Sequence, residues 1–337
     1  MSQSNPKVTP PVSPETSLKA SFVEIDEDRA GQRLDNFLLA SLKGVPKSRV
    51  YRIVRKGEVR VNKGRVKVSY RLQEGDTVRI PPIRQADAEE PVSPGAHVLA
   101  RIEASILAEE KGFLVLNKPS GIAVHGGSGL NYGVIEALRA LRPDAPYLEL
   151  VHRLDRETSG CLLIAKRRSV LREMHRLMRE KSQGKSQNDG MEKRYLALVK
   201  GRWEGGERRV DAPLLKNTLR SGERVVTISP EGKESLSLFR PVAYPEDATL
   251  VEVSLMTGRT HQIRVHAAAI GHPIAGDEKY GDERFNREMK AKGLRRLFLH
   301  AHFLSFSLEG HDQPYQFSAP LDEELETVLE RLKTVSS

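Results

Sequence analysis

Residues 151–160 read VHRLDRETSG, and this stretch decides more about the fold and the chemistry than any other in the chain. It lies between two apolar runs, residues 147–151 and 161–165, which predicts a loop joining two strands. Arginines on both sides of Asp155 favour its ionised, nucleophilic form. Taken alone, the pattern also fits a surface loop with local ion pairs. It is not the kinase catalytic loop, because Leu154 breaks the His-Arg-Asp spacing.

A second cluster, TGRTHQIRVH at residues 257–266, raises the question of a metal site. His261 and His266 are five residues apart, which fits neither a zinc-binding helix nor one face of a strand. His300 and His302 would share a strand face, but no carboxylate at ligand spacing accompanies them. We therefore expect no metal.

The positive charge of the chain is concentrated in one segment. The 337 residues contain 54 Lys and Arg against 45 Asp and Glu, a net charge of +9. Residues 31–84 hold 14 basic and 4 acidic residues, a net of +10, so the remainder holds 40 and 41, a net of −1. Such a segment indicates a polyanionic partner, although composition alone fits a solvated charged face equally well.

The composition also bears on location. No run of 18 apolar residues is present, which predicts that no helix spans a membrane, and the N-terminal stretch lacks the apolar region of a secretory signal. Cys161 is the only cysteine, which excludes an intrachain disulfide and a cysteine-based zinc site. We expect a cytoplasmic protein.

The basic segment has the pattern of a small binding module. Residues 33–42 and 47–56 carry apolar side chains at helical spacing, and short alternating stretches at 59–61, 66–68 and 78–80 predict strands. The solvent face of the second helix is almost wholly cationic and consists of Lys47, Arg49, Arg52, Arg55 and Lys56. Two helices beside a small sheet form a binding module rather than a catalytic one.

The rest of the chain predicts a larger α+β domain, because its strands and helices do not alternate regularly. The predicted strands are residues 105–108, 113–116, 194–199, 249–255 and 297–302, and the predicted helices are 169–181 and 322–333. The predicted division is a disordered tail at 1–20, a binding domain at 21–84, a linker at 85–100 and a catalytic domain at 101–337, with a polar insertion at 182–190.

Three motifs give a resemblance when they are taken together. HRLDRETSG, MEKRYLALVKG and TGRTHQIRVHAAAIGHPIAGD, at residues 152–160, 191–201 and 257–277, resemble the motifs of the RluA-type pseudouridine synthases. Residues 31–80 resemble the S4 RNA-binding domain. The likeness extends from about residue 22 to about residue 330. It implies a mixed, mainly antiparallel sheet in the catalytic domain.

The resemblance implies an isomerase that converts uridines of large-subunit (23S) ribosomal RNA to pseudouridine, without a cofactor or a metal. Asp155 would be the catalytic carboxylate and Arg264 its paired cation. Tyr195 would stack on the uracil and help to remove the proton from C5. One carboxylate could suffice, because the uracil anion delocalises its charge, whereas a sugar alkoxide needs a general acid. Whether Asp155 attacks the sugar or assists its deprotonation is left open.

The resemblance also implies the contacts to RNA. Arg153 would fill the space left by the flipped base, and His152 would contact the RNA or orient the loop. The five cations of the second helix would neutralise phosphates. We expect a monomer with no obligatory protein partner. The alternative is a non-catalytic RNA-binding or ribosome-assembly factor that keeps the fold.

Overall fold

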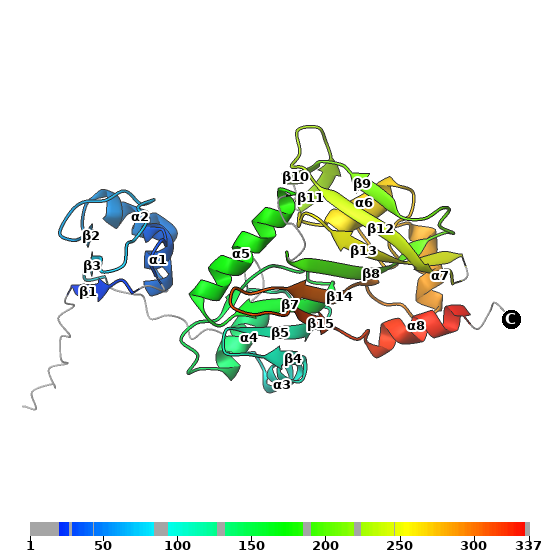
Figure 1. Cartoon of the computed structure of the whole chain (residues 1–337), viewed down its shortest axis with the longest axis horizontal. Helices are drawn as coiled ribbons and strands as arrows, with labels where there is room; N and C mark the ends of the chain where they lie inside the picture. The colour runs from blue at the N-terminus through cyan, green and yellow to red at the C-terminus, as the bar shows by residue number, and fades with distance from the viewer. Residues whose placement is uncertain are drawn as a thin grey trace, which may run out of the picture. The chain divides into compact units, whose positions relative to one another are not determined.

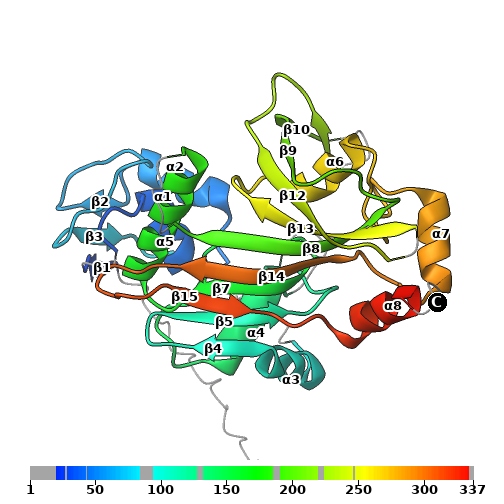
Figure 2. The same cartoon turned by 45° about the vertical axis from the view of Figure 1, so that its right-hand side comes forward.

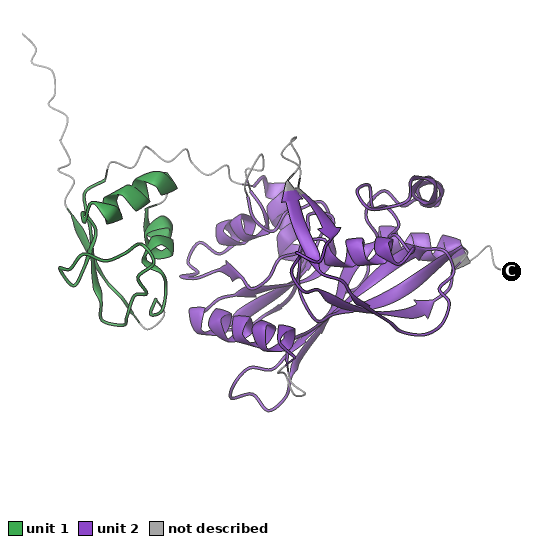
Figure 3. Cartoon of the chain, turned by 90° about the horizontal axis from the view of Figure 1, so that it is seen from above, with its two compact units in different colours: residues 1–91 green, residues 92–337 purple. Residues whose placement is uncertain are grey.

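A computed structural model describes residues 20–26, 29–42, 44–83, 94–126, 132–184, 190–218, 224–245 and 247–333. The chain forms two compact units, Met1–Pro91 and Val92–Ser337, which are coloured separately in Figure 3. The predicted tail, apart from residue 20, and residues 185–189 of the predicted insertion lie outside the described residues. No helix in the part of the chain that the structure describes is long and apolar enough to cross a bilayer.

The N-terminal unit pairs two helices with a three-stranded antiparallel sheet of order β1-β3-β2. Its elements are β1 (Ser21–Glu24), α1 (Leu34–Ser41), α2 (Lys47–Arg55), β2 (Arg60–Val61) and β3 (Thr77–Ile80). Both predicted helices are present, and their apolar faces close one core with the sheet. Val50, Ile53 and Val54 are the buried positions of α2, as their spacing predicts.

One predicted strand of this unit is absent. Residues 66–68 form no strand, because the backbone of this segment pairs with the first turn of α1 instead. The backbone N–H of Leu34 donates to the carbonyl of Tyr70 (2.8 Å), and that of Asp35 donates to the carbonyl of Val68 (3.1 Å). These carbonyls satisfy helix N–H groups that have no partner within the helix.

The second unit is built on a ten-stranded sheet, whose order is β4-β5-β7-β14-β8-β13-β12-β9 with β15 beside β14 and β6 beside β7 (Figures 1 and 2). Among the described strands, β7 and β14 are parallel and the other pairs are antiparallel, which confirms the predicted mixed, mainly antiparallel α+β domain. The strands are β4 (Ile106–Glu109), β5 (Phe113–Lys118), β6 (Glu149–Leu150), β7 (Ser159–Ala165), β8 (Glu192–Lys200), β9 (Arg208–Asp211), β12 (Leu236–Ala243), β13 (Ala248–Leu255), β14 (Leu299–Phe306) and β15 (Tyr315–Ser318).

Helices pack against both faces of this sheet. They are α3 (Ala96–Ala104), α4 (Val134–Leu141), α5 (Arg168–Ser182), α6 (Gln262–Ala269), α7 (Glu283–Ala291) and α8 (Glu323–Lys333), and a separate hairpin is formed by β10 (Leu214–Thr218) and β11 (Arg224–Ile228). Side chains alternate along β8, so Tyr195 and Ala197 face the main core with α3 to α6, whereas Leu198 joins a smaller core with α7 and α8. Figure 2 shows α7 and α8 together, away from α3 and α4.

The predicted linker is too long at its C-terminal end. Residues 96–100 were expected to belong to the linker at 85–100, but they form the first part of α3. Gly95 is the N-cap of this helix, and Ile102 is fully buried in the main core. The Pro-Gly pair at 94–95 therefore marks the start of a helix rather than the middle of a flexible segment.

Candidate active site

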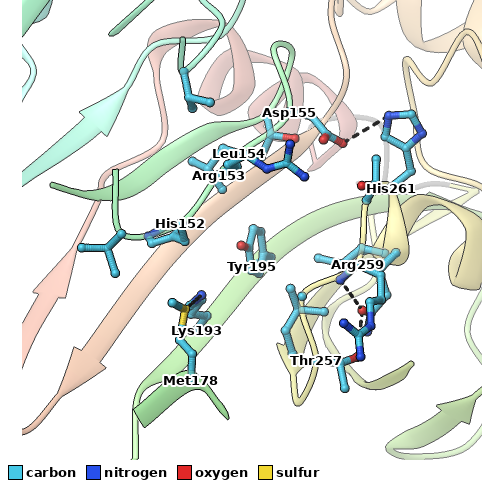
Figure 4. A pocket seen from close by; sticks show the side chains of 18 of the residues that line it. His152, Arg153, Leu154, Asp155, Met178, Lys193, Tyr195, Thr257, Arg259 and His261 are labelled. Atoms are coloured by element: carbon cyan, nitrogen blue, oxygen red, sulfur yellow. Dashed lines mark hydrogen bonds and ion pairs between the residues drawn. The ribbon is translucent and has the colours of Figure 1, made fainter. Parts of the chain in front are cut away.

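A pocket of about 1020 Å³ opens in the second unit, and Figure 4 shows its lining. Its walls come from the loop between β6 and β7, from α5 and β8, and from the segment that leads into α6. Among the described residues that line it, Asp155 is the one carboxylate. The lining also contains eight cationic side chains: Arg153, Arg156, Arg179, Lys181, Lys193, Lys216, Arg259 and Arg264. This charge balance suits a polyanionic ligand.

The loop that carries Asp155 is fixed through the turn that follows β5. The carbonyl of Arg156 accepts hydrogen bonds from the backbone N–H of Gly121 (3.0 Å) and from Nζ of Lys118 (3.1 Å). In return, Nε of Arg156 donates to the carbonyl of Gly121 (3.0 Å). Lys118 is completely buried. The loop therefore holds Asp155 in one place at the pocket wall without help from a ligand.

The cations that face Asp155 are not the ones next to it in the sequence. Arg156 pairs with Glu157 (3.4 Å), and Arg153 is exposed, so neither provides the expected support for the carboxylate. Instead, Nη1 of Arg264 lies 3.7 Å from Oδ2 of Asp155, and Nε2 of His261 lies 3.9 Å from the same oxygen. Figure 4 shows Asp155 and His261 facing each other. The predicted pairing of Asp155 with Arg264 is thus present, although no hydrogen bond joins them.

Arg264 is held more tightly by a residue that the sequence analysis did not single out. Its Nε and Nη2 donate to Oδ2 and Oδ1 of Asp277, both at 2.7 Å. Asp277 also accepts from the backbone N–H groups of Lys279 and Tyr280. Burial raises the pKa of the Asp277 carboxyl, but the hydrogen bonds and charge of Arg264 outweigh it and lower the pKa. This bidentate pair fixes the guanidinium beside Asp155.

His261 was weighed only as a metal ligand, but the structure places it in the pocket. It is the N-cap of α6 and has a left-handed backbone, with φ of 54°. A hydrogen bond of 2.8 Å links its Nδ1 to the hydroxyl of Tyr280. Burial lowers the pKa of His261 although the charge of Asp155 opposes this, and the charge of Arg264 acts in the same direction as burial, so the ring is neutral at neutral pH. A non-glycine residue with positive φ is often found at a functional site.

The segment before α6 is braced by one buried amide. Oε1 of Gln262 accepts from the backbone N–H of Arg259 and from the hydroxyl of Thr257, both at 2.9 Å (Figure 4). Its Nε2 donates to the carbonyl of Leu236 (3.0 Å) and to Oγ of Ser237 (2.9 Å). The motif TGRTHQIR therefore combines residues that shape the turn with residues that face the pocket.

Tyr195 lies on β8, and its buried ring faces the pocket between Asp155 and Lys193 (Figure 4). Burial raises the pKa of its hydroxyl well above the usual value, and the charge of Asp155 acts in the same direction. Tyr195 is therefore a neutral phenol at neutral pH. Its ring offers an apolar, flat surface to a ligand in the pocket.

His152 and Arg153, the two remaining predicted site residues of this unit, also line the pocket. Nε2 of His152 accepts from the backbone N–H of Leu163 (3.2 Å), which places the proton on Nδ1, and this atom has no partner among the described residues. Burial, followed by the charge of Lys193, lowers the pKa of His152 well below its usual range. His152 is therefore a neutral side chain that helps to fix the loop, whereas Arg153 is exposed.

The other histidines considered as metal ligands have structural partners. His266 bonds to Ser237 and to the carbonyl of Ala212, and His300 bonds to Ser159 and to the carbonyl of Ala319. His302 bonds to the carboxylate of Glu252. The described residues contain no group of three or more His, Cys, Asp and Glu side chains that could hold a metal ion.

The cationic face of the N-terminal unit is present as predicted. Four of its five side chains are exposed and Arg49 is partly exposed. Within the described part of the chain, none of the five forms an ion pair with a carboxylate, so their charges are available to an external anion. The face consists of Lys47, Arg49, Arg52, Arg55 and Lys56.

Comparison with known proteins gives the class. Residues 112–269 match the model of the RNA pseudouridylate synthase family, and residues 32–78 match the S4 domain. The first match contains Asp155, Tyr195 and Arg264. Together with the relatives described next, it shows that the chain belongs to the RNA pseudouridylate synthase family and is an enzyme of that class.

The similar relatives share nearly the whole length. The chain is 55% identical over 313 residues to the ribosomal large subunit pseudouridine synthase C of Haemophilus influenzae, which covers 93% of this chain and 95% of the relative. It is 56% identical over 315 residues to the protein of the same name from Escherichia coli strain K12, covering 93% and 96%.

Solved structures support the fold. Human RNA pseudouridylate synthase domain containing 4 matches with a TM-score of 0.56 and 26% identity, covering 70% of this chain and 95% of the human one. Human RNA pseudouridylate synthase domain containing 1 matches with a TM-score of 0.54 and 24% identity, covering 68% and 87%. At this level of identity the latter supports the fold alone.

Proposed function

We propose that this protein converts uridines of large-subunit ribosomal RNA to pseudouridine, with Asp155 as the catalytic carboxylate and Tyr195 and Arg264 completing the site. The observation that carries the proposal is the meeting of three separate sequence motifs in one cationic pocket, whose described lining contains one carboxylate. The likeness to the large-subunit synthases of two bacteria supports the choice of substrate. We further propose a cytoplasmic monomer that needs no protein partner.

The reaction needs no atoms beyond those of the substrate. The bond between C1′ of the ribose and N1 of the uracil breaks, the base turns, and C1′ forms a bond to C5. C5 then gives up its proton, which passes to solvent, and N1 takes up a proton from solvent. Asp155 either attacks the sugar or assists its deprotonation. Arg264, whose guanidinium lies 3.7 Å from the carboxylate, orients it and attracts its negative charge.

Tyr195 supports the base during this turn. Its ring stacks on the detached uracil, so that the base stays in the pocket while its orientation changes. Its hydroxyl helps to remove the C5 proton. The target base reaches the pocket only when it is flipped out of the RNA, and the exposed Arg153 fills the space that it leaves.

The S4 domain supplies affinity rather than chemistry. Its five cations on and directly after α2 bind phosphates, and His152 and Arg153 contact the RNA at the pocket itself. Contacts to phosphates position an RNA without reading its bases. Shape and base contacts at the pocket then select the uridine.

The test is to incubate the full chain with unmodified large-subunit ribosomal RNA and to map pseudouridine by chemical labelling and primer extension. The proposal predicts new pseudouridines at a few defined positions, formed without added metal or cofactor. RNA binding without any pseudouridine would contradict it and would favour a non-catalytic assembly factor.

A further inference from the structure

Two lysines line the pocket and form no ion pair with a carboxylate that the structure describes. Lys193 lies on β8, two residues before Tyr195, and Lys181 lies near the C-terminal end of α5. Nζ of Lys193 lies 3.3 Å from Sδ of Met178, and a thioether is only a weak acceptor. Neither lysine forms an ion pair within the described ranges of the chain.

This arrangement is unfavourable for the protein alone. Burial, followed by the charge of Lys181, lowers the pKa of Lys193 to about 8. Burial also lowers the pKa of Lys181, although the charge of Glu192 opposes it. Two like charges that are partly removed from water, without an ion pair to any described carboxylate, destabilise the fold. Groups held in this way are frequent at ligand sites, where the ligand provides the missing charge.

Among the described residues that line the pocket with Lys193, every charged or titratable side chain except Asp155 is cationic or neutral. They include Lys181, His175 and Arg179 from α5, His152 and Arg153 from the β6–β7 loop, Tyr195 from β8, Lys216 from β10 and Arg259 from the segment before α6. Asp155 lies at the other end of the pocket, with Tyr195 between it and Lys193 (Figure 4). The one carboxylate of the described lining therefore lies away from Lys193.

We propose that Lys193 and Lys181 form a phosphate-binding subsite, which holds a backbone phosphate of the RNA strand beside the target uridine. The inference rests on the proposed function, because it takes the ligand to be RNA. Two lysines, together with the exposed Arg179, which also lines the pocket, suit the repeated charges of a phosphodiester strand better than the single, delocalised charge of the uracil. The strand then passes along α5 while the flipped uridine lies between Tyr195 and Asp155.

The subsite can be tested by binding alone. Filter binding of the full chain to unmodified large-subunit ribosomal RNA is compared for wild type, Lys193→Met, Lys181→Met and the control Lys290→Met. Methionine keeps an apolar stem and removes the charge. Lys290 is exposed on α7 and does not line the pocket, so it matches the change in net charge. Each pocket variant should bind about tenfold more weakly and lower the salt slope by about 1, and the control should bind as wild type does.

Two further readouts separate a binding role from a structural one. Lys193→Met should unfold at the same or a higher temperature, because it removes a buried charge; a structural lysine would give a lower one. In the wild type, RNA binding should weaken as the pH rises above about 8, where the free lysine loses its proton, and this dependence should vanish in Lys193→Met. If Lys193→Met does not fold, Lys181→Met and Lys193→Arg test the subsite instead. Lys193→Arg keeps the positive charge and should keep the affinity for RNA.

Several results would overturn the subsite. The subsite is contradicted if both methionine variants keep the affinity, the salt slope and the pH dependence of the wild type. It is also contradicted if they lose turnover but keep wild-type affinity, because the lysines would then contact the uracil and not a phosphate. These binding measurements do not need turnover. If the wild type forms no pseudouridine, the proposed reaction is wrong, independently of the binding results for the lysine variants. If the wild type is active, the binding results test the subsite alone.

Discussion

At the scale of single residues, the guanidinium of Arg264 lies between two carboxylates that have different tasks. Asp277 is 1% exposed and takes two hydrogen bonds from it, whereas Asp155 is 30% exposed and lies 3.7 Å away. The buried pair orients the cation, and the more open carboxylate is left free to meet a substrate. We infer that Asp277 acts on the chemistry through Arg264.

Replacement of Asp277 should therefore affect both stability and turnover. Asp277→Asn leaves the buried Arg264 without its hydrogen-bonded counterion, which costs on the order of 3–5 kcal/mol. Urea unfolding measures this cost, and the control Asp211→Asn breaks an exposed pair with Arg209 worth at most about 1 kcal/mol. Equal stability of the two variants would contradict the assigned role.

The contribution of the Asp277–Arg264 pair to stability should also depend on pH. The pKa of Asp277 is lowered from its usual 3.8 in the folded protein, so its stabilisation is present above 3.8 and is lost as the pH falls through the lower folded value. Unfolding curves taken between pH 5 and acid should fall less steeply for Asp277→Asn than for wild type. Parallel curves would show that this carboxylate does not contribute.

Tyr195 gives a second test at this scale. Tyr195→Phe keeps the ring for stacking and removes the hydroxyl, so RNA affinity should stay and turnover should fall by about 100-fold, the lower end expected for loss of a proton-transfer group. Tyr195→Leu should also lose the stacking surface. Full turnover by the phenylalanine variant would show that the hydroxyl has no part in the chemistry.

The residues of the site could be predicted in part. Asp155, Tyr195 and Arg264 could be selected because each lies in a motif, and the structure brings them to one pocket. Their partners could not. Asp277 ends the same motif as Arg264, but the turn that folds it back is not visible in residue spacing. The arginines beside Asp155 looked like its partners because the sequence shows proximity along the chain and not the direction of side chains.

At the scale of elements, the pocket depends on the parallel pairing of β7 with β14 directly after the Asp155 loop. Gly160 pairs with Ala301 and has φ of 105°, and a Cβ there would lie 2.3 Å from the carbonyl oxygen of Ala301. Only glycine lets the two backbones approach so closely at the point where the loop enters β7.

Gly160→Ala should thus disturb the sheet and the loop together. We expect a loss of about 3 kcal/mol or more, since backbone strain adds to a clash with a backbone that cannot yield. Gly205→Ala is the matched control, because φ there is 80° but no atom lies within 4 Å of the added Cβ, and only about 1–2 kcal/mol of backbone strain is expected. Similar losses in both variants would contradict the close packing of β7 on β14.

Elements with a clear period could be predicted, and irregular ones could not. Helices α1, α2, α5 and α8 show apolar positions at helical spacing, and β5, β8 and β13 are long apolar runs. The strand expected at 66–68 is absent because tertiary hydrogen bonds to α1 compete for its backbone. The first five residues of α3 were assigned to the linker because a proline and a glycine precede them. These residue types occur in flexible segments, but they also occur at the start of a helix.

At the scale of the whole molecule, affinity and chemistry belong to separate cores. The apolar residues of the N-terminal unit form one cluster among themselves, and the pocket lies entirely in the second unit. The abrupt change of charge after residue 84 made this division predictable, and the S4 match at 32–78 agrees with it. The pocket was not predictable as a shape, because its lining runs from residue 123 to residue 299.

Deletion of residues 1–91 should therefore weaken RNA binding without unfolding the rest. Each lost phosphate contact removes about 0.7–0.9 from the salt slope, so the slope should fall by several. Circular dichroism and thermal unfolding of residues 92–337 check that the second unit keeps its fold. Unchanged affinity and slope for long RNA would show that the cationic face of α2 does not hold the substrate.

The central claim is that Asp155 carries out the isomerisation, and tritium release tests it most directly. Large-subunit ribosomal RNA labelled with tritium at C5 of uridine loses its label to water when C5 bonds to the sugar. Wild type should release tritium, whereas Asp155→Asn should bind the RNA with similar affinity and release none. Release by Asp155→Asn at the wild-type rate would contradict the account.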